Sequence, residues 1–332
     1  LFACAQAPTD SGDKTTQDTH ATETADTADT ADTADTSPTD TDTGDPLPTE
    51  AAAADLTWSL HPEIGAIGIL TWTQTADATS AWVEFRVGAD DWQASPPQDG
   101  ATGTHFAHVL GVPYDTDVEV RVVNDFGGGG VPSASIPGHT GALPDGIELP
   151  ATTTPLPADL DPGSDFLLLG IGMGDASWKL IFDRAGQVVW AHPSDGDTGS
   201  MQVSVDGHQL LWDDGAAIVH RMTLDGAISE TVDLPGLHHA FVEATDNTLV
   251  WGGKEDGRDA VWERATDGTV RRIFDCATYW EEHDASLPCD GNTLYWRADD
   301  DSLLFSSDNE NTVMHLDRVS GEVLHQWGQL DG

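Results

Sequence analysis

Short apolar runs, many of them alternating with polar residues, follow one another along the chain from residue 55 onwards. Val118, Val120 and Val122 alternate with other residues, which is the period of a strand with one buried face. Gly, Pro and Asp separate the runs, as they do at turns, and helical periodicity is absent. The pattern predicts an all-β protein, with early strands at residues 56–58, 67–72, 82–87, 106–109 and 118–123.

Residues 55–140 are expected to form one small β-sandwich. Trp72, the run 82–85 and the turn at 110–114 resemble a fibronectin type III or related immunoglobulin-like domain, which implies about seven strands. We expect the Trp and Tyr residues to lie in the core rather than to form a ligand platform. Residues 141–164 are rich in Pro and read as a linker to a second domain.

A unit made of a strand after a turn and a neighbouring hairpin recurs after residue 165. Internal repeats of a few tens of residues are typical of propellers and solenoids. Strands that follow a turn recur at 207–212, 247–251 and 302–305. The expected hairpin glycines are Gly186, Gly226, Gly268 and Gly321. Their spacing, roughly 40 to 50 residues, is the length of one four-stranded blade. Residues 165–332 therefore predict about four blades of an incomplete propeller, with six expected in all, and the chain reads as a fragment.

The charge of the chain is strongly negative. Its 332 residues include 58 Asp and Glu but only 13 Lys and Arg, which gives a formal charge of −45. Such a surface repels phosphate backbones, so nucleic-acid binding is not expected. The excess fits either a soluble surface of biased composition or adaptation to high salt or to divalent cations. The hydrophobic content of 38% is sufficient for two cored domains.

Residues 1–54 are expected to form a disordered acidic tether. They consist largely of Thr, Asp, Ala, Ser and Pro and include four successive Ala-Asp-Thr triplets at 25–36. Such a segment lacks the apolar residues needed to fold, and its like charges keep it extended. It is suited to hold folded domains away from a membrane surface.

The three cysteines fall into two groups. Cys4 follows Leu-Phe-Ala, which resembles the end of a bacterial lipoprotein signal, so we expect a lipid on Cys4 and attachment to the bacterial cell envelope. Cys276 and Cys289 then remain as an even pair. In an oxidising compartment we expect them to form a disulfide that adds about 3 kcal/mol. The sequence has no run of about 20 apolar residues that would span a membrane.

The propeller segment resembles the arylsulfotransferase family from about residue 166 to 332. The order of that family's motifs is followed by five segments, at residues 290–294, 303–307, 312–318, 321–323 and 327–328. A further segment, Leu-His-His-Ala at 237–240, looks like the family's His-His-Asp segment. The resemblance implies a six-bladed exported propeller that transfers sulfuryl groups between phenols. It also implies a pocket histidine at His238 or His239.

The same comparison implies a degenerate pocket. Asp290 stands where the family's His-x-Asn motif has its histidine, with Asn292 matching the asparagine, and Asp308 stands where the pocket arginine is expected. Carboxylates repel a sulfate in a partly dry site, where their charge is least screened. The histidine that carries the covalent sulfo group in the family would fall beyond residue 332.

Other polar clusters are weaker candidates. Calcium could bind the Asp residues of 195–199 or of 299–301, but neither segment has a complete twelve-residue calcium loop. Residues 281–284, Glu-Glu-His-Asp, could hold a metal, although a polar loop beside the cysteine pair is the favoured interpretation. We therefore assign no metal site and no cofactor beyond a weak candidate calcium ion.

Two functions remain open on the sequence alone. One is a lipid-anchored sulfotransferase that uses His238 or His239 on phenolic or aryl sulfate substrates. The other is a binding or scaffolding propeller that has lost the sulfate pocket. Sulfuryl transfer needs a nucleophile and cationic groups around the developing charge, and imidazole and guanidinium suit these roles.

Overall fold

A computed structural model describes residues 48–149, 165–173, 176–194, 199–283, 285 and 287–328 of the chain. Within these residues the protein is built from strands, with α1 (Cys276–Glu282) as its α-helix, so the prediction of an all-β fold is confirmed. No helix in the described part is long and apolar enough to cross a membrane. Cys4 and most of the expected tether, together with residues 150–164 of the expected linker, lie outside the described residues.

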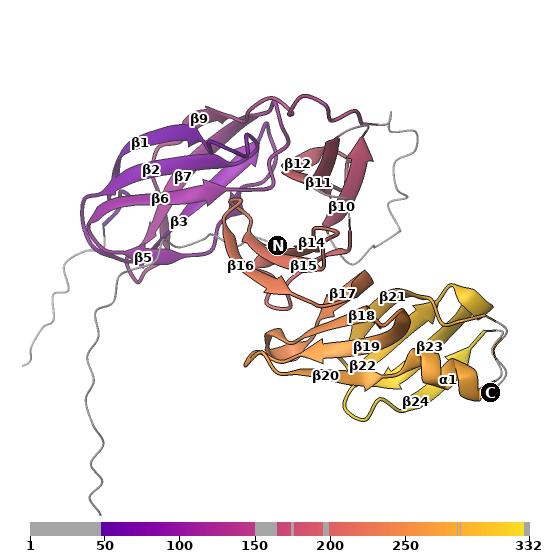
Figure 1. Cartoon of the computed structure of the whole chain (residues 1–332). Coiled ribbons are helices and arrows are strands. Elements are labelled where there is room, and N and C mark those ends of the chain that lie inside the picture. Colours follow the sequence, from indigo (N-terminus) through magenta and orange to yellow (C-terminus); the bar gives the residue numbers. More distant parts are fainter. Residues whose placement is uncertain are drawn as a thin grey trace, which may run out of the picture.

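A β-sandwich opens the described chain (Figure 1). One sheet has the order β1-β2-β6, formed by Ala53–Leu60, Gly68–Gln74 and Gly103–Val109. The strands of the other sheet are β3 (Ala78–Val87), β4 (Gln93–Ala94), β5 (Gln98–Gly100), β7 (Asp117–Asp125), β8 (Gly130–Pro132) and β9 (Ile136–His139). The strands β4, β5 and β8, of two or three residues each, were not expected from the sequence.

The inner faces of the two sheets form a single core. Buried positions alternate along β2, where Leu70 and Trp72 are no more than 1% exposed, and Val83 and Val120 oppose them from the second sheet. This alternation is the period of a half-buried strand. Trp92 departs from the expectation that aromatic residues are core, because the guanidinium groups of two arginines cover its ring.

Four small antiparallel sheets follow, and we call them blades 1 to 4 (Figure 1). Blade 1 consists of β10 (Phe166–Met173), β11 (Ala176–Asp183) and β12 (Val188–Ser194). Blade 2 consists of β13 (Met201–Val203), β14 (Gln209–Asp213), β15 (Ile218–Thr223) and β16 (Ile228–Asp233). Blade 3 consists of β17 (Leu237–Glu243), β18 (Leu249–Glu255), β19 (Arg258–Arg264) and β20 (Val270–Phe274). Blade 4 consists of β21 (Gly291–Arg297), β22 (Ser302–Ser307), β23 (Thr312–Asp317) and β24 (Val323–Trp327).

Strand order within each blade follows the chain, as in a propeller blade. The four predicted hairpin glycines all have positive φ, from 75° to 89°, and each lies in the turn before the last strand of its blade. Glycine adopts this conformation without the strain that other residues meet. The spacing of turn glycines in the sequence therefore marks the blades correctly.

Neighbouring blades pack face to face. Leu211 of blade 2 clusters with Phe241 and Trp251 of blade 3, and Val261 of blade 3 clusters with Phe305 of blade 4. Trp251 and Phe305 are each 1% exposed. Burying a side chain of this size contributes about 1.5 to 3 kcal/mol, so these seams hold the sheets together.

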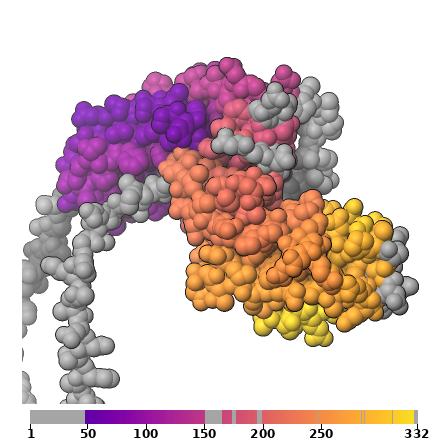
Figure 2. All heavy atoms as spheres, in the orientation of Figure 1, coloured from indigo at the N-terminus to yellow at the C-terminus, as the bar shows by residue number. Residues whose placement is uncertain are grey.

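The sandwich rests on the first two blades (Figure 2). Ile64 and Ile67, in the turn between β1 and β2, pack with Trp190 and Trp212 of blades 1 and 2. Tyr114 joins a second cluster with Leu180, Val188 and Ala191 of blade 1. The two parts thus share apolar cores, and the sandwich covers part of blade 1.

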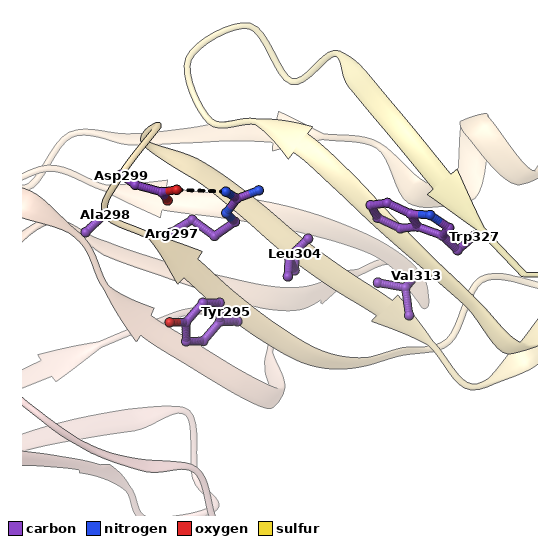
Figure 3. A pocket seen from close by; sticks show the side chains of 7 residues that line it. All are labelled: Tyr295, Arg297, Ala298, Asp299, Leu304, Val313 and Trp327. Atoms are coloured by element: carbon purple, nitrogen blue, oxygen red, sulfur yellow. Dashed lines mark hydrogen bonds and ion pairs between the residues drawn. The ribbon is translucent and has the colours of Figure 1, made fainter. Parts of the chain in front are cut away.

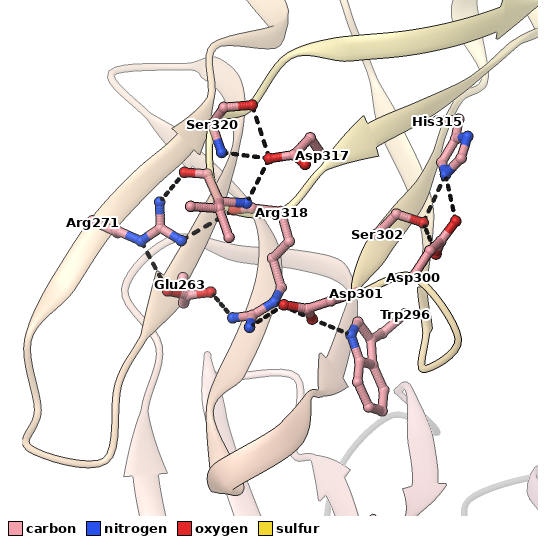
Figure 4. A network of polar contacts seen from close by, with 11 residues as sticks. Glu263, Arg271, Trp296, Asp300, Asp301, Ser302, His315, Asp317, Arg318 and Ser320 are labelled. Atoms are coloured by element: carbon pink, nitrogen blue, oxygen red, sulfur yellow. Dashed lines mark hydrogen bonds and ion pairs between the residues drawn. The ribbon is translucent and has the colours of Figure 1, made fainter.

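A partly buried ionic network ties blade 3 to blade 4 (Figure 4). Arg318 donates two hydrogen bonds to Asp301, at 2.7 and 2.8 Å, and also pairs with Glu263 of blade 3. Arg271 bonds to Glu263 at 2.8 Å and donates to the backbone oxygens of Arg318 and Val319. Because Arg318 and Glu263 are no more than 14% exposed, solvent screens this network weakly.

We expect the network to make stability fall in acid. The hydrogen bonds from Arg318 hold the pKa of Asp301 below its usual value. A carboxyl with a depressed folded pKa contributes stability above its unfolded pKa and loses it as pH falls through the folded value. Urea unfolding at pH 7 and pH 3 should show a smaller acid-induced loss for Asp301→Asn than for the wild type. The exposed control Asp233→Asn should behave as the wild type, and equal losses in all three proteins would contradict this account.

Candidate functional site

Four polar side chains of blades 3 and 4 meet where the first strands of these blades begin. His238 lies in β17, Lys254 near the end of β18, Asp259 near the start of β19, and Asp290 directly before β21. The Lys254 Nζ lies 3.2 Å from His238 Nε2, 3.3 Å from Asp290 Oδ1 and 3.9 Å from Asp259 Oδ2. The structure thus brings predicted site residues His238 and Asp290 together around a lysine.

A bulge in β17 places the two predicted histidines side by side. Leu237 pairs with Gly253 and Phe241 with Trp251, so three residues of β17 oppose one residue of β18. His239 has a φ of 66°, which breaks the alternation of the strand. The rings of His238 and His239 are therefore only 3.8 Å apart. Adjacent side chains of a regular strand point to opposite faces, and the bulge is the reason why these two do not.

Lys254 and Asp259 are brought together by the hairpin of β18 and β19. They are direct partners in the antiparallel ladder, across a turn that contains Gly257. Opposite charges at such positions stabilise a strand pair. Asp259 Oδ1 also accepts a hydrogen bond of 3.3 Å from the backbone N–H of Gly291 in blade 4. Its carboxylate, 5% exposed, therefore links the two blades.

Gly236 allows the chain to approach this hairpin closely. It has a φ of 73°, and a Cβ there would lie 2.3 Å from the carbonyl oxygen of Lys254. The Lys254 N–H donates to the Gly236 oxygen at 2.8 Å. Only glycine fits this approach, which brings the bulge to the end of β18.

Burial and charge shift the protonation equilibria of the cluster. Burial lowers the pKa of His238, and the neighbouring His239 and Lys254 lower it further. Burial raises the pKa of Asp259, against the attraction of Lys254. The site therefore combines an imidazole whose neutral form is favoured, one lysine and two carboxyl groups, one of which is made harder to ionise by burial.

The other predicted pocket residues lie close by but outside this cluster. Asp308 is exposed, and its backbone N–H donates to the backbone carbonyl oxygen of Asp290 at 3.0 Å. Asn292 is exposed at an irregularity in the pairing of β21 with β22. Neither side chain contributes a described contact to the cluster.

The acidic segments considered for calcium are engaged in other contacts. Asp299 pairs with Arg297, Asp300 accepts from the Ser302 hydroxyl, and Asp301 holds Arg318. Residues 195–198 lie outside the described part of the chain. Among the described residues, only His238, Asp259 and Asp290 bring three potential metal ligands together.

The polar segment 281–284 is organised by α1 and the disulfide. Cys276 and Cys289 are bonded, with Cα atoms 6.0 Å apart, which confirms the predicted pair. Glu281 pairs with Arg258, and His283 Nδ1 lies 2.8 Å from the backbone carbonyl oxygen of Tyr279. The expected polar loop is thus in part a helix, because Glu281 and Glu282 end α1 and His283 caps it, while Asp284 lies outside the described residues.

Two further hollows have a different character. A shallow groove on blade 4 is open to solvent (Figure 3), and it is lined by Tyr295, Arg297, Ala298, Asp299, Leu304, Val313 and Trp327. An apolar cavity of about 110 Å³ lies between the sandwich and blades 1 and 2, where Leu110, Trp190 and Leu210 are among its walls. A cavity without polar groups offers nothing to orient a polar ligand.

The sequence reasoning missed Lys254 and Asp259. The chain contains only three lysines, and Lys254 stands five residues before Asp259, across an Asp-Gly pair. Asp-Gly is a favoured hairpin turn, which would have placed the two side chains in register. That signal was present, but nothing in it indicated that His238 would reach the same point.

The solved structures compared with this chain are distant likenesses. No protein-family model matches the chain, and no curated protein matches it. Virginiamycin B lyase from Staphylococcus aureus is 14% identical over 85% of this chain and 86% of its own, with a TM-score of 0.35. A streptogramin B lyase is 13% identical over 49% of this chain and 59% of its own, with a TM-score of 0.34. TolB from Acinetobacter baumannii is 12% identical over 65% and 55%, with a TM-score of 0.39. The assignment of the fold therefore depends on the strand pairing observed in this chain and not on these likenesses.

We expect His238 to titrate below its ordinary pKa of 6.5 and the exposed His139 to titrate above it. Hydrogen bonds to Asp117 and Asp115 raise the pKa of His139, whereas burial and Lys254 lower that of His238. NMR titration of the imidazole signals, assigned with His238→Gln, measures both. Lys254→Met should raise the His238 pKa and leave that of His139 in place. A His238 pKa above that of His139 would contradict the statement that burial and Lys254 lower the pKa of His238.

Proposed function

We propose that the protein is a binding propeller, which holds a positively charged ligand at the junction of blades 3 and 4 and does not transfer sulfuryl groups. The observation that carries this proposal is the pairing of Lys254 with Asp290 and Asp259. Two acidic side chains face the one lysine of the cluster and occupy its ammonium group. This excess of acidic groups over basic groups favours a cation over an anion as the ligand.

Sulfuryl transfer makes the opposite demand on a site. Charge develops on sulfate oxygens during transfer, and cationic or hydrogen-bonding groups must be aimed at them. Here the buried Asp259 and the half-exposed Asp290 flank the imidazole, in a chain of formal charge −45. Both would repel an aryl sulfate at the position it must occupy.

The histidine pair favours the second candidate function, sulfuryl transfer between phenols. A neutral imidazole can act as a nucleophile, and the lowered pKa of His238 keeps it neutral near pH 7. The exposed His239 lies against it and could serve as a proton donor or acceptor. This candidate requires the Lys254 ammonium to act on sulfate rather than on its two carboxylates.

One experiment separates the two candidates. Protein incubated with an aryl sulfate and a phenol should give no sulfated product and no sulfated histidine by mass spectrometry. Benzylammonium should perturb the His238 ring signal in NMR spectra, whereas phenyl sulfate should not. Product formation that is lost in His238→Ala would establish the transferase and overturn the binding proposal.

We also propose that Cys4 carries a lipid and anchors the protein to the bacterial cell envelope. The Leu-Phe-Ala-Cys start and the acidic, low-complexity residues that follow support this location. A long charged spacer keeps folded domains clear of a surface. The charge of −45 argues against nucleic acid as a partner.

Cell fractionation of the precursor tests the anchor. The wild-type protein should be found with membranes and should be released by detergent, whereas Cys4→Ser should be soluble. A single acyl chain binds membranes only weakly, so a diacylated cysteine should hold nearly all of the protein. Membrane association that persists in Cys4→Ser would contradict the proposal, and Thr15→Ser, in the same low-complexity segment, serves as the control that keeps both Cys4 and the disulfide.

A further inference from the structure

We propose that His238, Asp259 and Asp290 form a binding site for a divalent transition-metal ion of the Zn²⁺ class. The inference rests on the proposed binding role and names the cation for the same site. One potential ligand atom of each residue lies within 4.8 Å of the others. The three residues come from β17, from β19 and from the residue before β21, so the fold, rather than one loop, brings them together.

The three ligand atoms already surround a positive charge. His238 Nε2, Asp290 Oδ1 and Asp259 Oδ2 lie 3.2 to 3.9 Å from the Lys254 Nζ. A metal with bonds of about 2.0 to 2.2 Å would hold ligand atoms about 3 to 4 Å apart. Side-chain rotations that contract the cluster by one or two ångströms would therefore complete a three-ligand site.

A second observation concerns the free nitrogen of the imidazole. His238 Nδ1 is buried and has no hydrogen-bond partner, although Asp259 Oδ1 lies 3.9 Å away. A buried polar atom without a partner costs about 1 to 3 kcal/mol. Imidazole can bind a metal through either ring nitrogen. An ion bound between His238 Nδ1 and Asp259 Oδ1 would satisfy this atom directly.

Burial of Asp259 points to a cation as well. Its carboxylate is 5% exposed, and the nearest ammonium is 3.9 Å away, beyond hydrogen-bonding distance. A buried carboxylate needs a close positive charge or strong hydrogen bonds. The carboxylate accepts a long hydrogen bond of 3.3 Å from the Gly291 N–H, which leaves it without a close positive charge.

The ligand chemistry selects the class of metal. Calcium and magnesium prefer oxygen ligands alone, whereas imidazole suits zinc and its neighbours in the first transition row. One nitrogen and two carboxylates with an open fourth position match a three-ligand zinc site. The site is thus a poor match to the calcium ion considered from the sequence.

Lys254 acts as an internal competitor for the ion. Its ammonium occupies the centre of the three ligands, while its side chain is 35% exposed and has room to swing into solvent. Binding of a metal must displace it, which weakens the apparent affinity. Replacing Lys254 with the uncharged Met, of similar length, should therefore tighten binding.

Co²⁺ absorption spectroscopy and competition of Zn²⁺ with a chromophoric chelator test the site on the whole chain. We expect d–d bands of low-coordinate Co²⁺ and Zn²⁺ binding at one equivalent. Affinity should rise at least tenfold in Lys254→Met and fall at least tenfold in His238→Gln and in Asp259→Asn. The control His139→Gln removes an exposed histidine that is hydrogen-bonded to two carboxylates and should change nothing.

Specific outcomes overturn the inference. Absence of Co²⁺ bands in both the wild type and Lys254→Met would exclude the site, as would equal losses in His239→Gln and His238→Gln. Circular dichroism establishes that each variant is folded, and Asp290→Asn, at a half-exposed position, provides a loss-of-ligand variant that does not disturb the core. If no metal binds while benzylammonium still perturbs the His238 signal, the proposal of a metal site is contradicted and the proposal of a cation-binding propeller is kept. Sulfuryl transfer would instead remove the binding role itself.

Discussion

The fold depends on covering both faces of each small sheet. A meander of three or four strands exposes two faces, and it gains stability only when neighbours bury them. Trp251 and Phe305 show how this is met, because each fills a seam between consecutive blades. Ile64 and Ile67 of the sandwich extend the same principle to blades 1 and 2. The blades and the sandwich therefore stabilise one another as a series of seams.

Apolar packing fills the middle of each seam, and polar groups gather at its ends. At one end of the seam between blades 3 and 4, Arg318 joins the blades through Glu263 and Asp301. At the start of β17 and of β21, the first strands of these two blades, lie His238 and Asp290. The first group is a closed network in which the charges are paired with good geometry. The second is looser, with longer contacts and an unpaired nitrogen, and this difference separates a structural cluster from a binding site.

Local patterns in the sequence predicted local features well. Turn glycines such as Gly226 and Gly268 marked the hairpins because their conformation is a property of the residue itself. The pairing of Cys276 with Cys289 followed from counting cysteines. The position of His239 did not follow, because a bulge of two extra residues is set by Gly236 and by the neighbouring strand. Strand periodicity assumes regular pairing, and it fails where the pairing is interrupted.

Units that touch only their neighbours behave as a one-dimensional chain of coupled elements. The outer strand of blade 4 exposes Leu324 and Trp327 to 42% and 55%, whereas Trp251 and Phe305, in the seams on either side of blade 3, are each 1% exposed. Local opening of β24 would therefore spread inward through blade 4 and reach Asp259 before it reached the sandwich. A ligand that bridges blades 3 and 4 binds only when both blades are folded, so it would raise the free energy of opening blade 4. Its binding energy would appear as slower exchange of amide protons throughout blade 4.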